Sequence, residues 1–87
     1  MKTEHHTISI TPDELDTIGM ALELYLEHEY KVSPKMFDAF ENETVDLLRG
    51  LTQCGYTMYI PGKKQFEGEV TTSVDKWLKA MKKKVVQ

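Results

Sequence analysis

The sequence predicts a small α+β fold, in which an antiparallel αα-hairpin and a C-terminal helix pack with a small antiparallel sheet. Three features predict it: two helix-start signals that each combine a capping residue with proline, an alternating aromatic segment, and an amphipathic stripe near the C-terminus. The expected order of elements is β-α-α-β-β-α. A chain of 87 residues buries roughly 60–65% of its unfolded surface, so we expect one compact domain over residues 1–87.

The first expected strand covers residues 5–10, where polar and apolar side chains alternate in the segment TISI. A helix over residues 12–31 should follow. Thr11 is a suitable N-cap, Pro12 fits the first helical position, and Glu14 completes a capping box. At about 100° per residue, one arc of this helix is apolar and is expected to face the core. Its members are Leu15, Ile18, Leu22, Tyr25 and Leu26.

The same start signal recurs at Ser33 and Pro34, which predicts a second helix over residues 34–53 that stops at Gly55. Only two or three residues would then separate the two helices, so we expect an antiparallel hairpin. The residues expected on its core side are Met36, Phe37, Phe40, Thr44, Leu47, Leu48 and Leu51.

The last third of the chain predicts a hairpin and a helix. Residues 56–60 alternate and are aromatic, Pro61-Gly62 suits a type II turn, and residues 65–71 can return as a partner strand. Gly68 weakens that second strand, so whether residues 56–71 form a true hairpin stays open. A third helix is expected over residues 73–84, with Val74, Trp77, Leu78, Met81 and Val85 as its apolar stripe.

Composition places the chain among ordinary globular proteins, with 40% apolar and 29% charged residues. Its net charge of −3 is unevenly divided: residues 1–50 carry eleven acids and four bases, whereas residues 51–87 carry three acids and seven lysines. No apolar run approaches the roughly 20 residues of a membrane span. The N-terminal segment lacks the apolar core of a signal peptide, and one cysteine allows no internal disulfide. We therefore expect a cytoplasmic protein.

The histidines do not form a recognisable metal site. His28-Glu29 begins like the zinc-protease signature H-E-x-x-H, but Val32 stands where the second histidine is needed. His5 and His6 are adjacent in a predicted strand and would face opposite sides, although a surface metal site shared across a dimer is an alternative.

Nor does the sequence present catalytic machinery. Cys54 falls on the core side of the expected second helix, with no histidine near it in sequence, so we expect a packed thiol. Pro61-Gly62-Lys63-Lys64 has lysines but lacks the framework of a phosphate-binding loop. We expect no enzyme activity, no cofactor and no catalytic or metal-binding residues.

One surface of the expected helix 12–31 is more apolar than a single covered side requires, because apolar residues lie opposite its core arc. Either another element of the chain covers them or a partner does. The candidate protein-binding residues are Met20, Ala21, Leu24 and His28, with the flanking acids Asp16, Glu23 and Glu27.

A second candidate surface is the lysine-rich side of the expected C-terminal helix. Such a basic helix can bind a polyanion, a membrane surface or an acidic protein, but cations also stabilise a helix C-terminus without any ligand. The candidate polyanion-binding residues are Lys76, Lys79, Lys82 and Lys83.

These features predict a small, non-enzymatic regulator or inhibitor that binds another protein and forms a homodimer. Its size and lack of catalytic motifs suit proteins encoded by phages and other mobile elements. One alternative is a nucleic-acid-associated protein that uses the lysine helix. Another is an acidic decoy that blocks the basic groove of a nucleic-acid enzyme.

Overall fold

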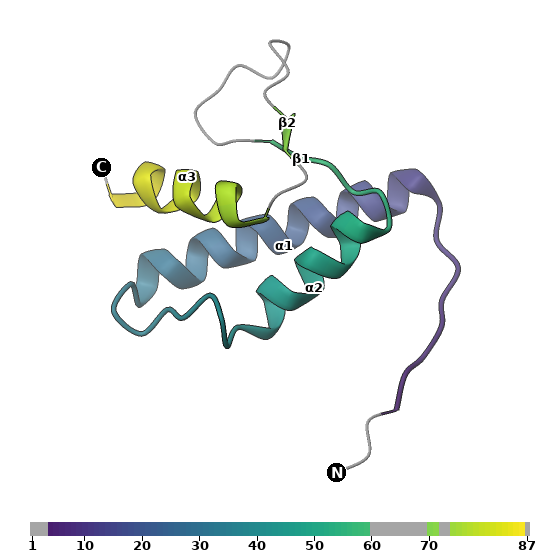
Figure 1. The fold of residues 1–87 in the computed structure, drawn as a ribbon, viewed down its shortest axis with the longest axis horizontal. Helices are drawn as coiled ribbons and strands as arrows, with labels where there is room; N and C mark the ends of the chain where they lie inside the picture. The colour runs from purple at the N-terminus through teal and green to yellow at the C-terminus, as the bar shows by residue number, and fades with distance from the viewer. Residues whose placement is uncertain (1–3, 60–69, 72–73, 87) are drawn as a thin grey trace.

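In the computed structural model, residues 4–59, 70–71 and 74–86 are described. Within them the elements are helix α1 (Pro12–Val32), helix α2 (Glu43–Gln53), strands β1 (Met58–Tyr59) and β2 (Val70–Thr71), and helix α3 (Val74–Val86). Helix α2 runs back across α1 in the opposite direction, while α3 lies beside α1 and runs with it (Figure 1). Each helix packs against both of the others.

The predicted α+β fold class is wrong, because the described part of the chain is a small all-helical fold of three helices. Strands β1 and β2 pair antiparallel, and in the described residues each contributes two positions, Met58 opposite Thr71 and Tyr59 opposite Val70. So short a ladder forms no layer on which helices could pack. The helices bury their apolar sides against one another instead.

The three strands predicted from the sequence are absent or short in the described residues. Residues 5–10 form no strand and belong to a coil that runs away from the helices (Figure 1). Of the predicted strand 56–60, the described residues 56–57 are not strand and residues 58–59 form β1, while the described end of the predicted strand 65–71 is β2. Residues 60–69, with the predicted turn at Pro61-Gly62, lie outside the described residues. Alternation over a few residues is thus a weak signal when the rest of the chain supplies no sheet.

Helix α1 begins where the sequence predicts. The Thr11 amide donates to Glu14 Oε1 at 2.8 Å, and the Glu14 amide donates to Thr11 Oγ1 at 3.1 Å, so the predicted capping box is confirmed. The helix ends at Val32, one residue past the predicted end. Pro34 disfavours helical geometry in the residue before it, and Ser33 accordingly leaves the helix with φ −138°.

Helix α2 starts nine residues later than predicted, at Glu43 instead of residue 34. Ser33 and Pro34 open only one turn, closed by the Met36 amide donating to the Ser33 carbonyl at 3.1 Å. The effective cap is Asn42, whose side-chain oxygen accepts from the Thr44 and Val45 amides at 2.9 and 3.3 Å. The predicted short hairpin link is therefore the longer connection 33–42, although the two helices still run in opposite directions (Figure 1).

The end of α2 is a Schellman motif, which confirms Gly55 as the helix stop. Gly55 has φ +109°, a conformation that favours glycine. Its amide donates to the Thr52 carbonyl at 3.1 Å, and the Tyr56 amide donates to the Leu51 carbonyl at 3.0 Å. This sharp reversal leads the chain from α2 toward Tyr56, which is buried.

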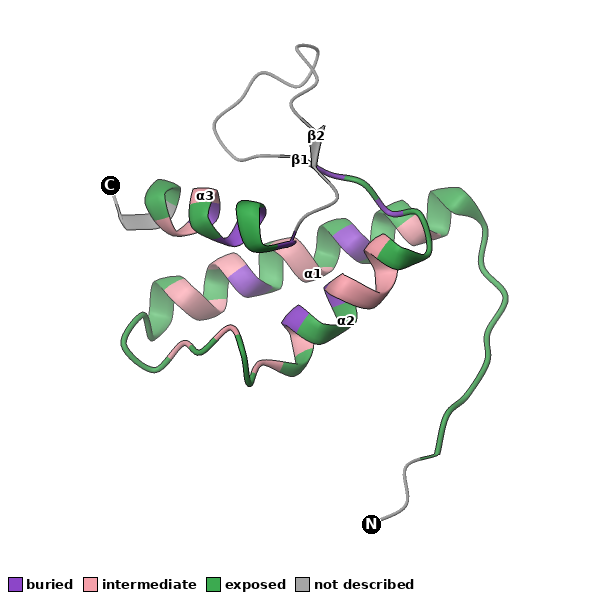
Figure 2. Cartoon of the chain, viewed as in Figure 1, coloured by how far each residue is buried: buried purple, intermediate pink, exposed green. Residues whose placement is uncertain are grey.

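One hydrophobic core lies where the three helices meet, and Figure 2 shows their buried residues turned toward that junction. Trp77 belongs to it, as predicted. The buried core residues are Leu26, Val45, Leu48, Tyr56, Met58, Val74, Trp77, Leu78 and Met81. The predicted apolar stripe of α3 also included Val85, whose side chain is not among those that the structure describes.

Several core predictions are wrong. Five residues expected in the core are exposed, namely Ile18, Tyr25, Met36, Phe40 and Leu47. Cys54 is also exposed, at the C-cap of α2, so the prediction of a packed thiol is wrong. In α1 the buried residues are Gly19 and Leu26. The covered side of the helix is therefore centred on these two residues, and Ile18 and Tyr25 lie outside it.

Gly19 is buried because the Tyr56 ring lies directly on the backbone of α1. A Cβ added at Gly19 would stand 2.3 Å from Cζ of Tyr56, far inside any real contact distance. Tyr56 is itself buried, so its ring has little room to move aside. Glycine at position 19 thus allows the segment after α2 to pack on α1.

This close approach predicts that Gly19→Ala lowers the free energy of unfolding by about 1–3 kcal/mol, through overpacking against Tyr56. Gly50→Ala is the matched control, because Gly50 lies within α2 and a Cβ there meets nothing within 4 Å. It should raise stability by about 0.5–1 kcal/mol through helix propensity. Urea unfolding of both variants measures the contrast, and equal midpoints would contradict the close packing at Gly19.

Candidate functional site

The outward side of α1 carries the apolar residues that the sequence singled out. Met20 and Leu24 are 60% and 66% exposed, and Ala21 and His28 are also exposed. Met20, Leu24 and His28 are spaced four residues apart, about one turn each, on the side of α1 away from the buried Leu26. No described element of this chain covers them. Of the two alternatives that the sequence left open, the described part of the structure therefore does not support the one in which another element of the chain covers these residues. Asp16, the first of the predicted flanking acids, is exposed as well.

The other two predicted acids of this surface turn toward α3. Glu27 is half-buried and its carboxylate lies 3.5 Å from Nζ of Lys84. Glu23 is half-buried and accepts hydrogen bonds from the Tyr56 hydroxyl and the Trp77 side chain. Both therefore join α1 to its neighbours and are less available to a partner than the sequence suggested.

Burial is the main influence on Glu23. Desolvation raises the pKa of this carboxyl above its ordinary value of 4.5, since the charged form loses hydration. The hydrogen bonds from Tyr56 and Trp77 oppose that shift by stabilising the carboxylate, and the nearby charge of Glu27 adds to it. The net direction is upward.

A groove of about 480 Å³ runs between the C-terminal half of α1 and the connection 33–42. It combines apolar side chains with carboxylates from both walls. Its lining residues are Tyr25, His28, Glu29, Val32, Ser33, Met36, Phe37, Asp38, Glu41 and Asn42. His28 borders this groove and also a smaller hollow on the other flank of α1, lined by Leu24, Glu27, Lys31 and Lys84.

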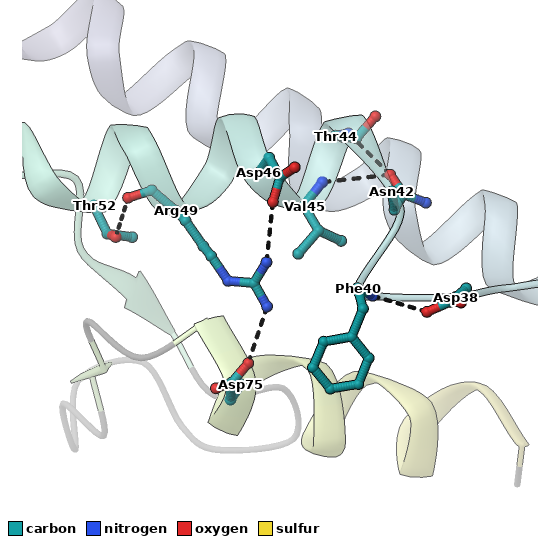
Figure 3. A network of polar contacts seen from close by, with 9 residues as sticks. All are labelled: Asp38, Phe40, Asn42, Thr44, Val45, Asp46, Arg49, Thr52 and Asp75. Carbon is teal, nitrogen blue, oxygen red and sulfur yellow. Dashed lines mark hydrogen bonds and ion pairs between the residues drawn. The ribbon is translucent and has the colours of Figure 1, made fainter.

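Hydrogen bonds hold the connection 33–42 in place. The Phe40 amide donates to Asp38 Oδ1 at 2.9 Å (Figure 3). The Glu41 amide donates to the Asp38 carbonyl at 3.3 Å. Asn42 caps α2 and its side-chain amide donates to Glu29 Oε1 at 3.4 Å, which links the connection to α1. The wall formed by residues 33–42 is therefore ordered by local contacts.

An aromatic contact anchors the same wall to the core. The rings of Tyr30 and Phe37 meet edge to face, with centroids 5.4 Å apart. Nζ of Lys82 lies 5.7 Å from the Tyr30 ring centroid and 5.4 Å from that of Phe37. Lys82, predicted for polyanion binding, is thus half-buried in a cation–π contact within the fold.

The remaining predicted lysines lie on the outer side of α3. Lys76, Lys79 and Lys83 are exposed. At its start α3 is tied to α2 by Arg49, whose guanidinium lies 3.2 Å from both Asp46 and Asp75 (Figure 3). The basic surface is accordingly a group of three lysines, smaller than the sequence indicated.

The motif candidates are dispersed. His28 is exposed, Glu29 is bound to Asn42, and His5 and His6 belong to the N-terminal coil. Among the described residues, no three His, Cys, Asp or Glu side chains are grouped so as to hold a metal ion. No helix in the described ranges is both long and apolar enough to cross a membrane.

Comparisons with protein-family models, with curated proteins and with solved structures found no significant match to this chain.

Sequence reasoning missed the groove, because it placed its walls in the core. Tyr25 and Met36 were expected on the covered sides of their helices, whereas they are 51% and 82% exposed and line the groove. Asp38 was the available signal, since an aspartate two residues before Phe40 favours a local turn over a helix.

The raised pKa of Glu23 predicts a specific pH dependence. Its contribution to the free energy of unfolding is largest below pH 4.5 and decreases as pH rises through the higher folded-state pKa. Glu23→Gln keeps a side-chain acceptor for Tyr56 and Trp77 but cannot ionise. The wild-type stability minus that of Glu23→Gln should therefore be largest at or below pH 4.5 and fall as the pH rises above it.

Urea unfolding across that pH range measures the difference. Asp16→Asn, on the exposed side of the same helix, is the control for removing one negative charge. A difference that stays constant with pH, or rises, would contradict the burial of Glu23.

Proposed function

We propose that this chain is a small non-enzymatic regulator or inhibitor that acts by binding another protein, and that it forms a homodimer through the outward side of α1. The observation that carries the proposal is the exposure of Met20 and Leu24 on a helix whose opposite side is already packed in the core. A lone surface helix places polar groups at such positions. Contiguous exposed apolar side chains are typical of a surface that a partner covers.

The chemistry of this surface suits a protein partner. Methionine adapts its shape to a facing surface, and the exposed Leu24 and Ala21 add apolar area beside it. Lys31 and the Glu27–Lys84 pair lie at its edge, next to His28. An apolar centre with a charged border is the usual arrangement of a protein–protein interface. A two-fold dimer would bring the same residues of two copies together.

The test is Leu24→Glu, which places a charge at the centre of the proposed contact without touching the buried Leu26. The wild type should sediment as a dimer, and the variant should sediment as a folded monomer with unchanged circular dichroism. Leu47→Glu is the matched control, since Leu47 is exposed on α2 away from this surface and the dimer should survive there.

A wild type that is monomeric at all concentrations would refute the homodimer. Unfolding of Leu24→Glu would show that Leu24 has a structural role. Dissociation by Leu47→Glu and not by Leu24→Glu would move the contact to α2.

A second candidate function, polyanion binding, is favoured by the exposure of Lys76, Lys79 and Lys83 on one side of α3. Changing all three to glutamine should alter the free energy of unfolding by less than about 1 kcal/mol, because the side chains are exposed. If α3 binds nucleic acid, the logarithmic salt slope of binding should shrink by roughly two to three units. We expect no such effect, and partner affinity should change less than about tenfold. A loss of about a hundredfold or more would move the binding surface to α3.

A further inference from the structure

The groove between α1 and the connection 33–42 presents apolar side chains that the core does not use. Val32 and Tyr25 stand on the α1 wall, and Met36 stands on the opposite wall, all three exposed. The hydrogen bonds at Asp38 and the packing of Phe37 on Tyr30 hold that opposite wall in position. The exposed apolar surface is therefore displayed by an ordered frame, which reduces the entropy lost when a ligand binds.

The charge of the groove favours a positively charged ligand. Three carboxylates line it, Glu29 from α1 and Asp38 and Glu41 from the connection, and no lysine or arginine is among the described residues of its lining. Its other titratable groups are His28 and Tyr25. Acidic borders on an apolar floor are complementary to a ligand that carries both apolar side chains and cations.

The form of the walls favours a helix. One wall is helix α1 and the other is the turn-containing connection, so neither offers a strand edge for an added β-strand. Packing of side chains into an apolar groove is the alternative mode, used by amphipathic helices that project residues at i, i+3, i+4 and i+7. Met36 gives the groove a wall that adapts to different apolar residues.

A second copy of this chain does not match that chemistry in its described part. Lys76, Lys79 and Lys83 lie on the outer side of α3. The apolar residues of α3 that are buried in the core are Val74, Trp77, Leu78 and Met81. The described coil 4–11 exposes Ile8 and Ile10 but contains Glu4 and no lysine or arginine. Neither of these two elements offers exposed apolar side chains together with cations. Helix α1 exposes Met20 and Leu24 near Lys31, but that surface also carries Asp16 and is the one assigned to the homodimer.

We infer that this groove binds a basic amphipathic helix of another protein, with apolar side chains against Val32 and Met36 and lysine or arginine against Asp38 and Glu41. The inference rests on the proposed function, in which the chain acts by binding another protein. The groove lies on a different flank of α1 from the homodimer surface. Its lining indicates the chemistry of the regulated partner, which the homodimer surface does not.

The experiment uses a fluorescent peptide of about 18 residues, made of leucine and lysine with leucines at amphipathic-helix spacing. Its binding to the full chain is followed by anisotropy, and a peptide with glutamate in place of every lysine serves as the charge control. The wild type should bind the lysine peptide and not the glutamate peptide. Asp38→Asn/Glu41→Gln should weaken binding by about tenfold or more, and less so at high salt.

Met36→Ser should weaken binding by a similar factor and leave the salt dependence unchanged. Asp38→Asn retains the oxygen that accepts from the Phe40 amide, so the connection should stay ordered. The matched controls are Asp13→Asn/Glu43→Gln and Leu47→Ser, which remove two charges and one apolar side chain at exposed positions outside both the groove and the proposed homodimer surface. These controls should change the affinity less than about twofold.

Equal losses in the groove variants and in the controls would overturn the inference, because they would indicate general attraction to an acidic protein. No binding of the lysine peptide by the wild type, or equal binding of the glutamate peptide, would overturn it too. If Met36→Ser dissociates a wild-type dimer, the occupant is a second copy and the inference fails. Retained peptide binding with a monomeric wild type would instead refute only the homodimer.

Discussion

The Tyr56 ring rests on the backbone of α1 at Gly19, and the arrangement of the three helices depends on this contact. The Schellman motif at Gly55 turns the chain toward α1 directly after α2. The Tyr56 hydroxyl then donates to Glu23, which also accepts from Trp77 of α3. Residues from α1, α3 and the segment after α2 thus meet around one half-buried carboxyl, which fixes how α1 is rotated toward its neighbours.

That rotation determines which residues of α1 face solvent. With Gly19, Glu23 and Leu26 turned inward, Met20 and Leu24 emerge on one flank, and Tyr25 and Val32 on the other. The two candidate surfaces are therefore consequences of the same packing. The flank next to α3 borders the Glu27–Lys84 pair, whereas the flank next to the connection borders carboxylates. Their different charges suit two different partners.

The connection 33–42 shows how local polar contacts can outweigh helix signals. Pro34 is compatible with a first helical position, yet Asp38 binds the Phe40 amide and Asn42 binds the amides of Thr44 and Val45. Each such side-chain acceptor favours a turn or a helix start over a continuous helix. The resulting long connection, in place of a tight link, forms one wall of the groove.

The sequence by itself determined the start of α1, the stop of α2, the position of α3 and the buried place of Trp77. The helix boundaries depend on residues close together in the chain, such as the Thr11–Glu14 box and Gly55, whose geometry is local. The burial of Trp77 follows from its place in the apolar stripe of α3. Of the candidate site, helical periodicity in the sequence indicated Met20, Ala21, Leu24 and His28, because an apolar residue opposite a covered side is visible in one helix alone.

The sequence predicted the wrong fold class and missed the groove. Whether a short alternating segment such as 5–10 pairs, and which side of α1 is covered, depends on contacts with distant elements. Only the tertiary structure decided that Tyr56 packs on Gly19 and that Glu23 turns inward, because those contacts join residues far apart in the sequence.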